Sequence, residues 1–251
     1  MSAGFKDHFS GSAGTYAEAR PDYPDSLFEW LAAQCCAHDL VWDCATGNGQ
    51  AAVALARHFA QVVATDASAK QIEAAKQAPN ISYRVAPAEA SGLGAASCDL
   101  VTVAQALHWF DLDAFYAEVR RVLKPGGVLA VWTYAPLHAP EDPAVDEAFR
   151  HFQDVTLGPW WPMEHDHCRN GYADLEFPFE RMITPKLVIE RHWGIRELAA
   201  YAASWSSTAA FRKSEGRDPI PDLVAALEAA WGEPEKRCRI LWDITIHATR
   251  L

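Results

Sequence analysis

Residues 41–50 read Val41-Trp42-Asp43-Cys44-Ala45-Thr46-Gly47-Asn48-Gly49-Gln50, and this stretch decides the fold. An apolar run that enters a glycine-rich loop is typical of a buried parallel strand followed by a helix. A second run, Val62-Val63-Ala64-Thr65-Asp66, also ends in a carboxylate. Because open parallel sheets bind ligands at the carboxyl ends of their strands, the two runs predict a nucleotide-cofactor site.

Two cofactors fit this loop. Gly47-x-Gly49-x-x-Ala52 satisfies the dinucleotide fingerprint, and Asp66 stands where an acidic residue binds a ribose hydroxyl, so the pattern allows NAD. Asp43 argues against NAD, because a carboxylate four residues before Gly47 would face a pyrophosphate of like charge. S-adenosylmethionine carries an ammonium and a sulfonium, and an acidic side chain suits both of these charges.

The loop resembles that of the class I S-adenosylmethionine-dependent methyltransferases, in particular the small-molecule group of methyltransferase type 11, which includes trans-aconitate methyltransferase-like proteins. That family usually has Asp-x-Gly-x-Gly-x-Gly, whereas Ala45 stands here at the first glycine. We expect Ala45 to narrow the approach of the methionine moiety without abolishing binding. Residues 98–110 and 121–129 match further landmarks in family order. The resemblance is greatest over residues 1–135 and implies S-adenosylmethionine as cofactor.

The resemblance also implies roles for single residues. Asp66 would hold both ribose hydroxyls, and Ala67 would lie against the adenine. Ala88 and Glu89 would meet the adenine amino group. The complete set of predicted cofactor-binding residues is Tyr16, Arg20, Asp43, Ala45, Gly47, Gly49, Asp66, Ala67, Ala88, Glu89, Ala104 and His108.

Tyr16 and Arg20 lie in a Tyr…Arg-Pro-x-Tyr-Pro stretch that is similar to one in the related group. The stretch looks like a lid over the cofactor, in which Arg20 could meet the cofactor's carboxylate. The alternative is that it tethers the amino-terminal arm to the surface.

His108 is the candidate catalytic residue, because a class I site places the residues after the fourth strand near the reactive methyl group. A base helps when the acceptor is an amine, a phenol or a carbon acid, whereas a carboxylate acceptor needs none. Alternatively, His108 caps the next helix or contacts the cofactor through its backbone. Aromatic residues are predicted to wall the substrate pocket, with core packing as the alternative: Trp109, Trp160, Trp161 and Trp205.

Glu164-His165-Asp166-His167-Cys168 resembles a metal-binding cluster. Alternate residues of a short segment rarely converge on one ion, and no second cluster has zinc spacing. We therefore expect a solvated loop here and no metal site.

The formal net charge of −11, with no run of lysines and arginines, disfavours an extended nucleic-acid surface and adhesion to anionic membranes. We expect no signal peptide and no membrane span, and we interpret the six cysteines as reduced thiols of a cytoplasmic protein. The expected partner is a small-molecule methyl acceptor. The sequence does not indicate the oligomeric state.

The order of apolar runs predicts a Rossmann-like, doubly wound α/β fold with a seven-stranded, mostly parallel sheet, an antiparallel late strand and a lid or insertion. Strands are expected at 40–44, 61–65, 81–85, 99–104, 128–134, 186–193 and 239–249. Helices are expected at 26–37, 50–58, 69–77, 113–123, 144–157, 195–204 and 222–231. One domain would hold an N-terminal lid and helix (1–37), a cofactor-binding core (38–135), an insertion over the active site (136–185) and a C-terminal part (186–251).

The sequence thus favours transfer of a methyl group from S-adenosylmethionine to a small molecule, with a carboxylate as one possible acceptor. Two alternatives remain open at this point. One is an NAD-dependent oxidoreductase, and the other is a non-catalytic cofactor-binding or interaction protein.

Overall fold

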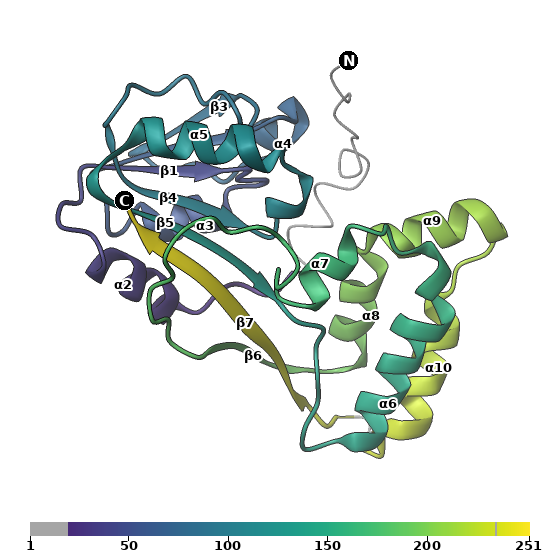
Figure 1. The fold of residues 1–251 in the computed structure, drawn as a ribbon. Helices are drawn as coiled ribbons and strands as arrows, with labels where there is room; N and C mark the ends of the chain where they lie inside the picture. The colour runs from purple at the N-terminus through teal and green to yellow at the C-terminus, as the bar shows by residue number, and fades with distance from the viewer. Residues whose placement is uncertain (1–19, 234) are drawn as a thin grey trace.

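The computed structural model describes residues 20–233 and 235–251, so Tyr16 lies outside the described residues. A seven-stranded sheet with the order β3-β2-β1-β4-β5-β7-β6 forms its centre (Figure 1). The strands are β1 (Leu40–Cys44), β2 (Gln61–Asp66), β3 (Ile81–Val85), β4 (Cys98–Ala104), β5 (Leu123–Tyr134), β6 (Leu187–Trp193) and β7 (Cys238–Arg250). β7 pairs antiparallel with both β5 and β6, and the other pairs are parallel. The predicted fold class is confirmed.

Helices cover both faces of this sheet. α2 (Asp25–Ala33) and α3 (Gln50–Leu55) bury Leu27, Leu31 and Leu55 in one core cluster. α5 (Leu112–Val122) buries Phe115 in the other, against Trp42 of β1. The short α4 (Ala69–Glu73) follows β2. Burial on two faces explains why β1, β2 and β4 read as continuous apolar runs.

Five further helices form a cap beyond the ends of the central strands (Figure 1). They are α6 (Pro143–His151), which continues as a π-helical turn over Phe152–Thr156, α7 (His165–Arg169), α8 (Ile195–Ala203), α9 (Ser206–Glu215) and α10 (Ile220–Trp231). α6 packs on α10, and α10 on α8. Phe149 of α6 meets Trp205 edge to face, with ring centroids 5.5 Å apart. Aromatic contacts of this kind hold the cap together.

The expectation of a solvated loop at residues 164–168 is wrong. His165–Arg169 forms α7, which contacts β5 and the 3₁₀ turn Leu107–Trp109. Cys168 is buried in this contact. Burying one face of a short helix stabilises it where the sequence alone gives too few periodic positions to indicate one.

Residues 124–127, which lie between the expected helix 113–123 and the expected strand 128–134, are part of β5 in the structure. The strand begins at Leu123, which pairs with Cys98, and Leu251 N donates to Gly127 O at 2.9 Å. A Cβ on Gly127 would lie 2.8 Å from Lys124 O, so a close backbone approach requires glycine here. Pairing with Cys98 and with the end of the chain thus extends β5 to residues before the expected strand 128–134.

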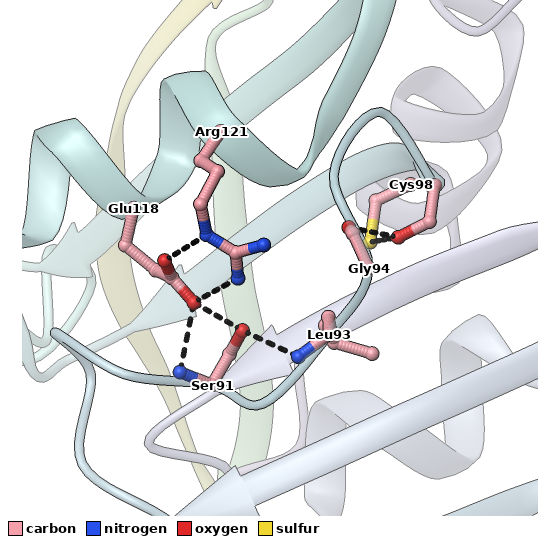
Figure 2. A network of polar contacts seen from close by, with 7 residues as sticks. Ser91, Leu93, Gly94, Cys98, Glu118 and Arg121 are labelled. Carbon is pink, nitrogen blue, oxygen red and sulfur yellow. Dashed lines mark hydrogen bonds and ion pairs between the residues drawn. The ribbon is translucent and has the colours of Figure 1, made fainter.

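A polar network ties the loop after β3 to α5 (Figure 2). Glu118 Oε1 accepts hydrogen bonds from Ser91 N at 2.9 Å and from Ser91 Oγ at 2.5 Å. Arg121 Nε donates to Glu118 Oε2 at 2.6 Å. These bonds, those from Arg121 first, lower the pKa of Glu118 from 4.5 to about 2. The same loop carries Ala88 and Glu89, so the network positions two of the predicted site residues.

Glu118→Ala is expected to lower the free energy of unfolding by about 2 kcal/mol at pH 7, because it leaves the buried Ser91 N–H without its partner. Since the folded pKa is depressed, this stability is present above the unfolded value of 4.5 and is lost as the pH falls toward 2. Urea unfolding at pH 7 and pH 3 measures both effects. Glu29→Ala on the exposed side of α2 is the control. Equal stability of the two variants would contradict the assignment.

Candidate active site

A cavity of about 570 Å³ opens at the carboxyl ends of β1, β2 and β4. Its walls hold most of the predicted cofactor residues: Arg20, Asp43, Ala45, Gly47, Asp66, Ala67, Ala88, Glu89, Ala104 and His108, together with Trp109. Gly49 lies outside the lining. It precedes α3 with φ +82°, and a Cβ there would overlap the Tyr83 hydroxyl, so Gly49 serves the turn.

The carboxylate of Asp43 accepts hydrogen bonds from two threonine side chains. Thr46 Oγ1 donates to Asp43 Oδ2 at 2.6 Å, and Thr102 Oγ1 donates to Oδ1 at 2.7 Å. The side chain is 1 % exposed, and burial raises its pKa from 3.8 to about 6 despite these bonds. Asp43 therefore acts on the cavity through its charge, while both of its oxygens already have hydrogen-bond donors.

Asp66 joins the loops that follow β1 and β2. Its Oδ2 accepts from Gly47 N at 2.9 Å, and its Oδ1 accepts from Ser68 N at 2.8 Å. The carboxylate lies in the cavity wall beside Ala67. The predicted ribose partner thus also fixes the glycine loop.

Most of the non-glycine residues with a positive φ lie in or next to this site. The non-glycine residues with positive φ in the described ranges are Ala45 at 54°, Ala96 at 47°, Gln105 at 55° and Tyr172 at 61°. Ala45 and Gln105 line the cavity, and Tyr172 contacts His108. Left-handed backbone costs a non-glycine residue about 1–2 kcal/mol, and such strain is concentrated at functional sites. The alanine in place of the family glycine keeps the conformation that glycine would favour.

A second cavity of about 110 Å³ adjoins the first and reaches under the cap. The two share five lining residues: Arg20, Gln105, His108, Trp109 and Tyr134. Trp161 and Trp205 line the second cavity, with His165, Arg169 and Tyr201. Trp160 does not line either cavity; its ring packs on Phe211 of α9 with centroids 4.8 Å apart. The prediction of a pocket role for Trp160 is therefore corrected to packing within the cap.

His108 lies where the two cavities meet. Its Nδ1 is 3.1 Å from Tyr172 Oη and 3.4 Å from Cys168 Sγ. Burial lowers the pKa of His108 to about 3, so the ring is neutral at physiological pH. His108 does not cap α5, because the Asp111 side chain accepts from Ala114 N at that helix start.

Sequence reasoning missed several residues of the site. Thr102 lies beside Asp43 because the register of β1 with β4 pairs these two residues. Gln105 lines the cavity with its backbone at a positive φ of 55°. His165 and Arg169 arrive on α7. His165 lies in the Glu164–Cys168 stretch, for which the sequence predicts a solvated loop. No local pattern indicates Gln105 or Arg169, and the apolar character of β4 indicates only that Thr102 is buried.

The described residues contain no group of three histidine, cysteine or acidic side chains that could hold a metal ion. All six cysteines are free thiols. Within the same residues, no helix has the length and apolar character needed to cross a membrane.

Comparison with known proteins shows the family. Residues 42–131 match the family described as a methyltransferase domain. The chain is 32% identical over 229 residues to a candidate methyltransferase of Dictyostelium discoideum, which covers 90% of this chain and 87% of that protein. The chain belongs to the class I S-adenosylmethionine-dependent methyltransferases. A solved structure of a candidate type II methyltransferase from Anaeromyxobacter dehalogenans is 43% identical, with a TM-score of 0.86 over 92% of this chain and 97% of that one.

S-adenosylmethionine is the cofactor of this methyltransferase family, and the cavity fits it. Five carboxylates line the larger cavity, against the two cations Arg20 and Lys76: Asp22, Asp43, Asp66, Glu89 and Glu164. This negative lining suits a sulfonium and an ammonium and opposes a pyrophosphate. Open space surrounds the Cα of Gly47, and the cavity volume lies within the range of small-ligand sites, roughly 300–1,000 Å³. Membership of this family excludes the alternative of an NAD-dependent oxidoreductase.

Proposed function

We propose that this methyltransferase transfers a methyl group to a small-molecule acceptor that carries a carboxylate and binds in the second cavity. The observation that carries the proposal is the position of Arg20, which lines both cavities. Arg20 Nη1 donates to Tyr134 Oη at 2.9 Å, and its guanidinium lies 5.8 Å from the Tyr201 ring centroid. A guanidinium held between aromatic walls suits recognition of a carboxylate.

The character of His108 supports the same acceptor class. With a pKa of about 3, a neutral histidine is a weak base and would take a proton from an amine or a phenol poorly. A carboxylate is already ionised at neutral pH and attacks without help. We therefore assign His108 to positioning, in the wall between the two cavities, in place of the predicted catalytic role.

S-adenosylmethionine supplies an activated methyl group when it is bound, so the protein's task is to orient the acceptor and exclude water. Asp66, Ala67, Ala88 and Glu89 would hold the nucleoside end. Residues 136–185 would form an insertion over the site. Arg20 would belong to a lid together with Tyr16, which lies outside the described residues.

The test is a screen of purified protein against small carboxylic acids, phenols and amines, with S-adenosylhomocysteine as the measured product. We expect acids to be methylated, and Arg20→Gln to lower kcat/KM for them by about 30-fold through the loss of charged hydrogen bonds worth about 2 kcal/mol. Arg57→Gln is the control, since its side chain is 64% exposed. A separate titration with S-adenosylhomocysteine shows whether Arg20→Gln also weakens the cofactor site.

Methylation of amines or phenols alone would overturn the carboxylate proposal. Tight binding of S-adenosylhomocysteine without turnover of any compound would favour a non-catalytic cofactor-binding protein.

A further inference from the structure

Gln105 places an amide group where the two cavities meet. The residue lines both cavities and is half-buried. Its main-chain N–H donates to Trp132 O at 2.9 Å, and its side-chain Oε1 accepts from Thr133 Oγ1 at 2.8 Å. Thr133 is buried in β5, so this bond ties the oxygen of the amide to the sheet. The nitrogen of the amide, Nε2, is the polar end that remains.

The Nε2 atom of Gln105 is accessible. Within residues 20–233 and 235–251 it has no hydrogen-bond partner. It is also not one of the side-chain polar atoms in these ranges that are both buried and unpaired. An unpaired nitrogen that is not buried borders open space, and the open space that Gln105 lines is that of the two cavities. Nε2 thus offers N–H donors to a bound molecule.

The backbone of Gln105 also indicates a function for this residue. Its φ of 55° lies in the left-handed region, which glycine and asparagine adopt more readily than glutamine does. Strain of this kind persists where the surrounding structure maintains it, and it is concentrated at active sites and ligand clamps. The chain therefore keeps a glutamine at a position where a smaller residue would be less strained.

The other residues at the junction indicate what this amide would meet. Of the five residues that both cavities share, only Arg20 carries a formal charge, since burial keeps His108 neutral. Among the described residues that line the second cavity, none is acidic. An amide N–H needs a lone pair, so Gln105 suits an oxygen of the acceptor and gives no hydrogen bond to an ammonium group.

We propose that Gln105 is a specificity-determining residue whose Nε2–H donates a hydrogen bond to an oxygen of the methyl acceptor at the junction of the two cavities. The inference rests on the proposed function and adds to Arg20 a second, uncharged recognition point. An acceptor with an ammonium at this point would face a donor with a donor, so the site would discriminate against it. The bond from Thr133 fixes the amide before the acceptor binds.

The experiment compares wild type with Gln105→Met and Gln105→Asn. Methionine has a similar length and no donor, whereas asparagine keeps an amide and tolerates the left-handed backbone. Four quantities are measured: KM and kcat for an acid that the protein methylates, the Kd of benzoate for protein saturated with S-adenosylhomocysteine, and the Kd of S-adenosylhomocysteine itself.

Gln105→Gly and Ala96→Gly form a matched pair that separates backbone strain from recognition. Ala96 also has a left-handed backbone, with φ 47°, but it is exposed and lines neither cavity. Glycine relieves the strain at both positions, so we expect the urea midpoint to rise in Ala96→Gly. In Gln105→Gly the loss of the bond from Thr133 offsets this gain, and KM for the acid rises in this variant alone. A glutamine that only braced the turn through Thr133 would leave KM unchanged.

For Gln105→Met we expect KM and the benzoate Kd to rise by about 10-fold, which corresponds to one lost hydrogen bond. The value of kcat should change little, because a bond made equally in the bound and transition states affects KM. Partial recovery in Gln105→Asn, wild-type KM in Ala96→Gly and an unchanged Kd of S-adenosylhomocysteine complete the expected result.

Unchanged KM and benzoate Kd in Gln105→Met, with turnover intact, would overturn the inference and leave the proposed function standing. An effect confined to the Kd of S-adenosylhomocysteine would also overturn it, because it would place Gln105 in the cofactor site alone. Benzoate binding that depends on Gln105, without methylation of any acid, would support the recognition role and count against the proposed function. Wild-type protein that neither binds benzoate nor methylates an acid would overturn both.

Discussion

Asp66→Ala is expected to weaken binding of S-adenosylhomocysteine by about 2 kcal/mol or more, roughly 30-fold in Kd. Two losses add up. The proposed role of this carboxylate is to hold both ribose hydroxyls, and in the structure it also accepts from Gly47 N and Ser68 N. Removing it takes away one of the ties between the glycine loop and the end of β2 and leaves the bond from Thr46 N to Thr65 O, so the cofactor would have to order a looser loop when it binds.

Calorimetric titration with S-adenosylhomocysteine measures the affinity of the Asp66 variant. Asp113→Ala on the exposed side of α5 is the control for loss of one negative charge from a protein of net charge −11. Asp66→Asn separates the two losses, because an amide keeps one acceptor for a backbone N–H. Wild-type affinity in Asp66→Ala, with the fold intact by circular dichroism, would show that the carboxylate at the end of β2 does not bind the ribose.

Local patterns predict the strands of the sheet, both the buried strand β1 and the half-exposed edge strand β3. β1 and β3 match the expected 40–44 and 81–85, and the late antiparallel strand is found within one residue at each end. The cap is different. α9 contains one large apolar residue, Phe211, and α7 spans five residues. Their stability comes from aromatic packing between segments distant in sequence, which a periodicity within one segment does not contain.

The same distinction holds for the site. The glycine loop and the two strand-end carboxylates were predicted because one βαβ unit carries them, and they lie together in the larger cavity. The second cavity combines Arg20 with residues of β5, α7 and α8. Its lining residues on α7, His165 and Arg169, depend on how the cap packs over the strand ends. The sequence motif therefore indicates the residues around the cofactor cavity, whereas the residues around the second cavity depend on tertiary packing.

Asp43→Asn is expected to stabilise the protein at pH 8 by about 2 kcal/mol and to weaken cofactor binding by about 10-fold. The folded pKa of Asp43 is raised from 3.8 to about 6, mainly by burial. Below 3.8 the residue is protonated in both the folded and the unfolded states. Between 3.8 and 6 the unfolded chain releases this proton while the folded protein keeps it, so stability falls over this interval and the loss levels off above 6. Asparagine is neutral at every pH and avoids that loss.

Urea unfolding of wild type and Asp43→Asn at pH 4.5, 6 and 8 tests this sign. The stability gain of the variant should be largest at pH 8 and about one third as large at pH 4.5, where the unfolded carboxyl is mostly ionised but the folded one still carries its proton between Thr46 and Thr102. A gain that did not vary with pH would show that Asp43 ionises normally. In wild type the affinity for S-adenosylmethionine should rise as the pH passes 6, because a sulfonium nearby favours the ionised carboxyl. The charge of Asp43 therefore lowers the stability of the free protein but favours binding of the cofactor. Burial causes both effects, because a low-dielectric surrounding makes the carboxylate harder to ionise and also strengthens its attraction for a cation.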